Sequence, residues 1–277
     1  MNILVTTDFS ENSKSGLRFA ISLAKINNAR LIFYNSCIIA SQISWSEAAY
    51  LQYEKKEIQK RLIRLNKFIA ELYKSMKISS SNYECVIKHS MLPESGIIAY
   101  AKKQAIDFIC IGTQGAGSIK KIFGTTAGNL ITKSPIPVIA VPKNYKQKEI
   151  TNIFFASDFK NYSKELKIVV DFAKPLNASV EVFHLTYAGE KLINAVAITT
   201  KLKLKLNHNI KLRISKTDLS KSLIVNLQQA ITTSKPSLVV MFTDQKRTFF
   251  QKLLLSSTSE SLAFKTTVPL LIFNKIK

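Results

Sequence analysis

Cysteine is scarce in this sequence, with three copies in 277 residues. Cys37, Cys85 and Cys110 are odd in number and far apart, which excludes a disulfide framework and the C-x-x-C spacing of a metal site. Each lies in or beside an apolar run. This placement is typical of small buried hydrophobic side chains in a reducing compartment.

Long hydrophobic runs are also missing. No stretch approaches the ~20 apolar residues that a membrane-spanning helix needs. The first ten residues, MNILVTTDFS, contain no basic segment and reach an acidic residue at Asp8, which argues against a signal peptide. We therefore expect a cytoplasmic protein that inserts no segment into a membrane.

Acidic residues are few: 18 Asp and Glu stand against 40 Lys and Arg, which gives a net charge of +22. Such an excess favours anionic partners, among them nucleic acid, membrane surfaces and small anions. The lysines are scattered along the chain rather than gathered in a patch with aromatic residues or a known nucleic-acid motif. We expect a surface that attracts anions non-specifically, and no specific nucleic-acid binding.

Catalytic constellations are absent from the sequence as well. It holds no Ser-His-Asp arrangement, no paired catalytic carboxylates and no H-E-x-x-H motif. His89, His184 and His208 do not have the spacing of metal ligands, so we expect them to be surface or hydrogen-bonded residues. These absences point away from an enzyme and from a bound metal.

What the sequence does contain is a repeat. The matching segments keep the same order in both halves, and they are 3–9 with 153–159, 108–111 with 238–241, and 137–140 with 269–272. The repeat predicts two domains, at residues 1–143 and 151–277, each of ordinary domain size. The polar, basic stretch NYKQKEIT between them is a plausible linker.

Within each half, short apolar runs alternate with amphipathic stretches. This alternation predicts an α/β fold: two tandem Rossmann-like domains, each a five-stranded parallel sheet flanked by helices. In the first half we expect strands at 2–6, 30–37, 83–88, 107–112 and 137–141. Helices are expected at 13–25, 46–76 (one long helix or a pair), 93–103 and from 125 onward.

The stretch 112–126, GTQGAGSIKKIFGTT, follows a strand, opens a helix and holds four of the eight glycines. Glycines let the backbone approach a bound group closely, and free amides at a helix start form an anion site. Ligands in such sheets bind at the carboxyl ends of the strands, where Asp8, Asp158 and Gly112 fall. An alternative role for Asp8 is to cap the turn that leads into the first helix.

This pattern resembles tandem universal stress proteins, the UspA-like superfamily with an adenine-nucleotide α-hydrolase-like fold. Its ATP-binding members carry G-x2-G-x9-G-[ST] after strand four and an Asp after strand one. This sequence has Gly112-x2-Gly115-x8-Gly124-Thr125, one residue shorter, together with Thr6-Thr7-Asp8. The resemblance covers nearly the whole chain.

The resemblance implies a role for each matching residue. Thr6, Thr7 and Asp8 would lie at the adenosine, and the backbone around Cys37 would meet the adenine ring. The ribose and phosphates would be held by Gly112, Gly115, Gly124, Thr125 and Thr126. ATP, with Mg²⁺ accompanying it, is the implied cofactor. The resemblance also implies pairing of the two domains within the chain and allows a homodimer.

The second half departs from the pattern, because Phe242, Gln245 and Ser256 replace its three glycines. We therefore expect no nucleotide in that half. The sequence predicts a universal stress protein whose first domain binds an adenine nucleotide and thereby regulates contacts with partner proteins. A nucleotide-free interaction protein and a slow ATP hydrolase are the alternatives.

Overall fold

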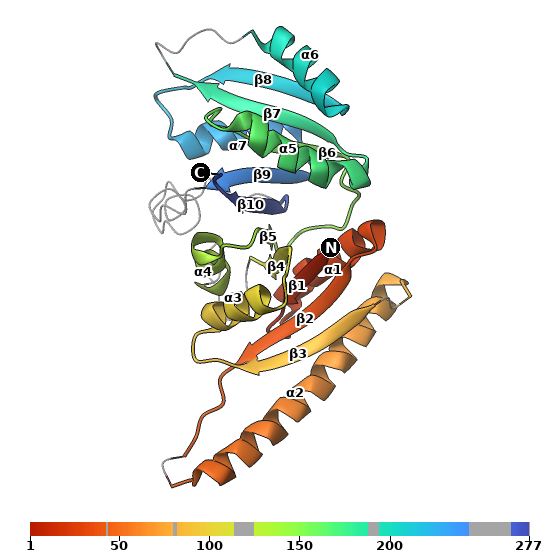
Figure 1. Ribbon diagram of the computed structural model, residues 1–277, viewed down its shortest axis with the longest axis vertical. Coiled ribbons are helices and arrows are strands. Elements are labelled where there is room, and N and C mark those ends of the chain that lie inside the picture. The colour runs from red at the N-terminus through yellow and green to blue at the C-terminus, as the bar shows by residue number, and fades with distance from the viewer. Residues whose placement is uncertain (43, 80–81, 114–124, 188–193, 244–266, 277) are drawn as a thin grey trace. The chain divides into compact units, whose positions relative to one another are not determined.

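The computed structural model describes residues 1–42, 44–79, 82–113, 125–187, 194–243 and 267–276. The chain divides into two compact units, Met1–Lys143 (unit 1) and Asn144–Lys277 (unit 2). Figure 1 traces the chain through both units from the N-terminus to the C-terminus. Each unit is described by itself below.

Unit 1 is a five-stranded parallel sheet with the strand order β3-β2-β1-β4-β5. Its elements, in chain order, are β1 (Asn2–Thr6), α1 (Lys14–Asn27), β2 (Arg30–Cys37), α2 (Glu47–Met76), β3 (Tyr83–His89), α3 (Pro93–Lys103), β4 (Phe108–Gly112), α4 (Thr125–Lys133) and β5 (Val138–Val141). The connections from β1 to β2 and from β2 to β3 run in one direction along the sheet, and the connections from β3 to β4 and from β4 to β5 run in the opposite direction. Right-handed crossovers then put α1 and α2 on one face, and α3 and α4 on the other.

The central strands of unit 1 are buried on both faces, as their continuous apolar sequences predict. Ile3, Leu4 and Val5 of β1 have no exposed surface. Helix ends follow local chemistry: Pro93 occupies the first turn of α3, and the Ser46 side chain accepts a hydrogen bond from the Ala49 amide at the start of α2. The predicted fold class is confirmed, and the stretch from 47 to 76 is one helix rather than two.

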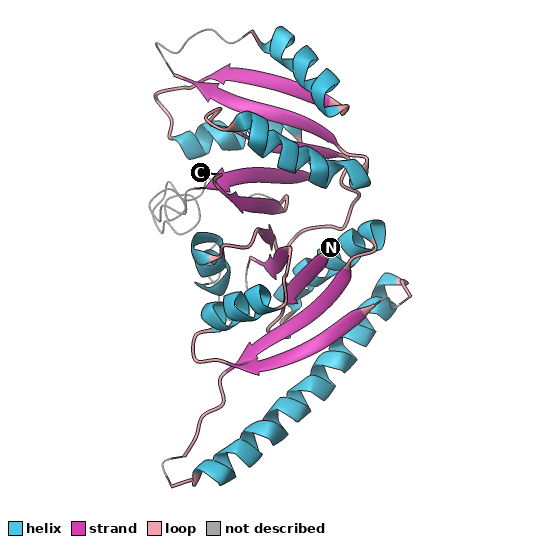
Figure 2. Ribbon diagram, in the orientation of Figure 1, coloured by secondary structure: helices cyan, strands magenta, loops and turns pink. Residues whose placement is uncertain are grey.

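Unit 2 repeats the arrangement with the strand order β10-β9-β6-β7-β8, again all parallel (Figure 2). Its elements are β6 (Asn152–Ala156), α5 (Tyr162–Ala173), β7 (Ser179–Thr186), α6 (Ala195–Leu206), β8 (Ile210–Lys216), α7 (Leu223–Ser234), β9 (Leu238–Thr243) and β10 (Leu270–Asn274). The strand registers also repeat: Ile3 pairs with Phe108 in unit 1, and Ile153 pairs with Leu238 in unit 2. The internal repeat in the sequence is therefore a repeat of structure.

The helix on the outer strand is the largest difference between the units. Helix α2, which packs against β3, is 30 residues long, whereas α6, its counterpart in unit 2, is 12 residues long. The fully buried side chains of α2 all lie in its second half, and they are Leu65, Ile69, Leu72 and Tyr73. Its first half carries the exposed Leu51 and Tyr53, and Ile63, just past the middle, is exposed too. In the described residues, no helix is long and apolar enough to cross a membrane.

Candidate functional site

The turn after β1 lies at the carboxyl edge of the unit 1 sheet. Phe9 in this turn has a φ of 64°, a left-handed conformation that is uncommon for a residue other than glycine. Thr7 Oγ1 accepts a hydrogen bond from the Phe9 amide at 3.0 Å, and Asp8 Oδ1 accepts from the Ser10 amide at 3.0 Å. Thr7 Oγ1 also lies 2.8 Å from Ser13 Oγ. These side chains hold the backbone in its strained path.

Asp8 therefore has a structural role in this turn. Its Oδ1 accepts a second hydrogen bond, from Ser10 Oγ at 2.6 Å. The carboxylate is exposed, so one oxygen stabilises the turn while the charge stays at the sheet edge. The capping role is thus present, and it does not preclude contact with a ligand.

Asn35, a residue that the sequence motifs did not single out, supports the same turn from β2. Its Nδ2 donates to the carbonyl of Thr7 at 2.8 Å, and the Thr7 amide donates to the carbonyl of Tyr34 at 3.0 Å. Asn35 is almost fully buried. The sequence did carry a signal for this role. Asn35 directly follows the four residues LIFY of a predicted buried strand, and a buried polar group needs a hydrogen-bond partner.

Cys37 ends β2 beside this turn. Its carbonyl accepts from the Ser90 amide at 2.9 Å, and the Ile39 amide donates to His89 Nδ1 at 3.0 Å. The backbone that was predicted to meet an adenine ring thus already has partners within the protein. Burial raises the pKa of the Cys37 thiol above its ordinary value, which keeps it protonated and unreactive.

The other two thiols are also protonated packing groups. Burial raises the pKa of Cys85 to about 11 and raises that of Cys110 further. Cys37 and Cys110 are buried as expected, whereas Cys85 is only half-buried.

Gly112 ends β4 and packs against the start of α1. A Cβ built on Gly16 would lie 2.8 Å from the Gly112 amide nitrogen, and one on Gly112 would lie 3.1 Å from the carbonyl oxygen of Asn12. No side chain fits between these two backbones. Gly16 was not predicted, although a glycine inside a helix often marks such a close approach. The result is a carboxyl edge with no side chain on the last residue of β4.

The remaining predicted site residues follow Gly112 in the chain. Gly115 and Gly124 lie outside the described residues. Thr125 is the first residue of α4, and Thr126 is half-buried in its first turn. The helix thus begins where the glycine-rich stretch ends, and its first amides and dipole favour an anion there.

Unit 2 keeps the turn. Phe159 has the same φ of 64°, and its amide donates to Ser157 Oγ at 3.1 Å. His184 replaces Asn35: its Nδ1–H donates to the carbonyl of Ser157 at 3.0 Å. Asp158 Oδ1 again accepts from a backbone amide, that of Lys160, at 3.1 Å.

The surroundings of this turn differ, because the C-terminal segment crosses the edge of unit 2. Lys275, which follows β10, forms an ion pair with Asp158, and its Nζ lies 3.9 Å from Glu165 Oε1. Asn161 Nδ2 donates to the carbonyl of Ile276 at 2.9 Å. Burial alone would raise the pKa of Asp158, but the hydrogen bonds from Lys275 and the Lys160 amide bring it below its ordinary value.

In unit 2, aromatic rings occupy the strand position that corresponds to the glycine at the end of β4 in unit 1. Phe242 stands where unit 1 has Gly112, and its ring stacks on Phe273 with centroids 4.9 Å apart and meets Phe155 at 5.6 Å. Gln245 and Ser256 lie outside the described residues. Packed aromatic side chains thus occupy this part of the unit 2 edge, with Phe242 half-buried.

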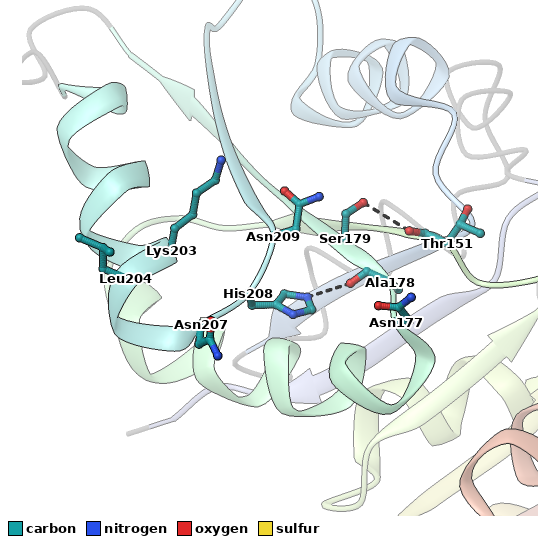
Figure 3. Close-up of a pocket in the computed structure, with 9 residues that line it drawn as sticks. All are labelled: Thr151, Asn177, Ala178, Ser179, Lys203, Leu204, Asn207, His208 and Asn209. Atoms are coloured by element: carbon teal, nitrogen blue, oxygen red, sulfur yellow. Dashed lines mark hydrogen bonds between the residues drawn. The ribbon is translucent and has the colours of Figure 1, made fainter.

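A separate hollow of about 760 Å³ lies in unit 2 (Figure 3). It is at the amino ends of β7 and β8, away from the carboxyl edge, and its lining is mostly polar. His208, one of the lining residues, donates from Nε2–H to the carbonyl of Ala178 at 2.8 Å. Within the described residues, no group of three or more His, Cys, Asp or Glu side chains could hold a metal ion.

The parallel sheets, with helices on both faces and strand order reversing at β1 and β4, define a doubly wound α/β protein. The Universal stress protein family model matches residues 1–142, so this chain belongs to that family. The stress response protein NhaX of Bacillus subtilis is 29% identical over 160 residues, covering 50% of this chain and 96% of that protein.

Solved structures agree on the fold. A universal stress protein from Archaeoglobus fulgidus has a TM-score of 0.72 at 16% identity, covering 99% of this chain and 98% of the other. A universal stress protein in complex with cAMP covers 51% of this chain and 96% of its own, at 20% identity and a TM-score of 0.38. That last similarity is too low to bear on individual residues.

Proposed function

We propose that this universal stress protein binds ATP or a related adenine nucleotide at the carboxyl edge of unit 1. Bound nucleotide would regulate its contacts with partner proteins in a stress response. The observation that carries the proposal is the contact between Gly16 and Gly112. It brings the start of α1 against a strand end without a side chain, immediately before the glycine-rich stretch and α4.

The roles of individual residues follow from this placement. The amides at the start of α4, with the hydroxyls of Thr125 and Thr126, would meet phosphate oxygens, and Mg²⁺ would accompany them. Asp8 and the neighbouring Thr6 and Thr7 would lie at the adenosine. Unit 2 would stay empty, because Phe242 and the Lys275–Asp158 ion pair take up the corresponding positions.

A nucleotide-free interaction protein is the second candidate. Two observations favour it: the Cys37 carbonyl and the Ile39 amide already have partners, and Asp8 caps its own turn. In that case the edge of unit 1 would be a structural feature only. The protein would then act through its surfaces.

The test begins with the purified full chain, from which small molecules are released and identified by mass spectrometry. ATP is then titrated by calorimetry. We expect one site per chain, lost in Gly115→Asp. Two sites per chain would contradict an empty unit 2, and no released nucleotide with no heat would favour the nucleotide-free protein.

Asp8→Asn separates the two roles of Asp8. The amide oxygen of Asn still accepts the hydrogen bonds of the turn, so thermal stability should not change, while a ligand that contacts the charge should bind more weakly. Asp158→Asn in unit 2 is the matched control, and it should leave binding unaltered. Equal affinity in Asp8→Asn and the parent would assign Asp8 to the turn alone.

A further inference from the structure

Helix α6 of unit 2 presents an outer face in which apolar side chains lie between lysines. Val196 and Leu204, eight residues apart, are 77% and 81% exposed. Lys201, Lys203 and Lys205 are exposed on the same helix, whereas Leu202 points into the unit and is buried. We call Val196, Lys201, Lys203, Leu204 and Lys205 the α6 face.

The sequence of α6 and β8 supplies no acidic side chain to offset the positive charge of this face. Residues 194–217, which include α6 and β8 and one residue beyond each, contain no Asp or Glu. The acidic residues on β7 and just after β8 pair with other cations. Glu181 Oε1 accepts from Arg213 Nε at 2.6 Å, and Asp218 pairs with Lys221 at 2.8 Å.

The types of cationic and apolar side chain on the α6 face indicate the class of partner that it fits. Nucleic-acid surfaces combine lysines and arginines that contact phosphates with aromatic rings or guanidinium planes that stack with bases. Residues 194–217 contain one arginine, Arg213, and it is held by Glu181, by Ser234 Oγ at 2.6 Å and by the carbonyl of Ala230. The α6 face offers lysines and aliphatic side chains instead. Aliphatic groups flanked by lysines suit the boundary between lipid headgroups and acyl chains.

We propose that the α6 face docks unit 2 on an anionic lipid bilayer. The helix, 12 residues or about 18 Å long, would lie along the surface without crossing it. The lysines would meet lipid phosphates while Val196 and Leu204 enter the boundary region. Lys203 and Leu204 both line the polar hollow (Figure 3). The hollow would supply hydrogen-bonding groups to the adjacent headgroups.

The test is co-sedimentation of the full chain with vesicles. The probes are vesicles of phosphatidylcholine alone and vesicles in which about one third is replaced by phosphatidylglycerol, a charge density chosen to resemble an anionic leaflet. We expect binding to the anionic vesicles only, weakened by added salt. Absence of binding to anionic vesicles at low salt would overturn the proposal.

Two sets of variants locate the contact. Lys201→Gln, Lys203→Gln and Lys205→Gln together should weaken binding about a hundredfold, because each lysine near an anionic surface is worth roughly fivefold. The matched control carries Lys55→Gln, Lys56→Gln and Lys67→Gln on α2, exposed lysines with the same total charge change. Equal losses in the two triple variants would show that net charge alone drives binding, which overturns the proposal.

The apolar contribution is tested separately. Leu204→Ser should weaken binding about tenfold at a salt concentration that screens the lysines. Leu51→Ser, at another exposed leucine, should have no effect. A single-stranded RNA homopolymer is the competitor. If the α6 lysines prove necessary for RNA binding while vesicles are not bound, the face is a nucleic-acid contact and the proposal is wrong.

Discussion

In unit 1 the last residue of β4 is a glycine that lies against Gly16 of α1, whereas the same two positions in unit 2 hold Phe242 and Leu166. Leu166 follows Phe159 by the same number of residues as Gly16 follows Phe9. The turn itself is unchanged, with a φ of 64° in both units. The same turn is thus compatible with a strand end that carries no side chain, as in unit 1, and with one that carries a phenylalanine, as in unit 2. What the edge can bind is decided by the residues that surround the turn.

The largest effect that separates the units is expected from Gly16→Ala. The new methyl would meet the backbone of Gly112 at 2.8 Å, and we expect a loss of about 2 kcal/mol in the free energy of unfolding. Gly96→Ala is the matched control in α3. There the methyl meets the Oγ and Cβ of the Ser90 side chain at 2.8 and 2.9 Å rather than the backbone of a central strand, and we expect a smaller loss, about 1 kcal/mol. Urea unfolding measures both, and equal losses would contradict the close backbone contact.

A somewhat smaller effect is expected from Lys275→Met, which removes the ion pair between Lys275 and Asp158 in unit 2. Hydrogen bonds to charged groups contribute ~1.5–3 kcal/mol, and the partly exposed Asp158 places this one near the lower limit, about 1.5 kcal/mol. Lys167→Met breaks an exposed pair with Asp171 and should cost about 0.5 kcal/mol. Hydrogen exchange in unit 2 is the measurement.

The stability lost in Lys275→Met should also depend on pH. The folded pKa of Asp158 is lowered, so its contribution to stability is present above the ordinary Asp pKa of about 4 and is lost as the pH falls through the folded value. The stability difference between the parent and Lys275→Met should therefore shrink in acid. A difference that stays constant down to the lowest pH at which the fold survives would show that the ion pair does not stabilise unit 2.

The smallest effect is expected from Asn35→Ala. It removes the hydrogen bond to the Thr7 carbonyl in a buried setting and should cost about 1 kcal/mol. Asn66→Ala removes an exposed hydrogen bond to the Leu62 carbonyl, and a loss below about 0.5 kcal/mol is expected. Thermal unfolding measures both. Asn35→His extends the test, because it places in unit 1 the histidine that donates the equivalent hydrogen bond in unit 2. It should recover part of the stability lost in Asn35→Ala.

The regular elements could be predicted because each carries its own periodic pattern. The predicted bounds of β1, β2 and α3 agree with the structure to the residue, and apolar runs between polar turns were sufficient for this. Gly16, Asn35 and Lys275 were missed for a common reason. Each acts through a partner that is distant in sequence, respectively Gly112, Thr7 and Asp158, and such contacts exist only once the sheet has formed.

The site was predictable in outline but not in detail. Asp8 and Gly112 lie at the carboxyl edge because strand ends in a parallel sheet meet there. The hydrogen bonds between Asp8 and Ser10 are local, and the sequence had offered capping of this turn as one of two roles for Asp8. The local pattern could not reveal that the Cys37 carbonyl is engaged with Ser90, because that contact joins segments far apart in the sequence.

Helix α2 has a further consequence. Its second half is fixed by Leu65, Ile69 and Leu72, while its first half has few buried side chains. Short helical stretches without tertiary packing are only marginally stable in water. We therefore expect two regimes of local opening in one continuous helix: amides before about residue 60 should exchange by local fraying, and those after it only when the core opens. The long helix is, in dynamic terms, an extension of unit 1 that can unwind without unfolding it.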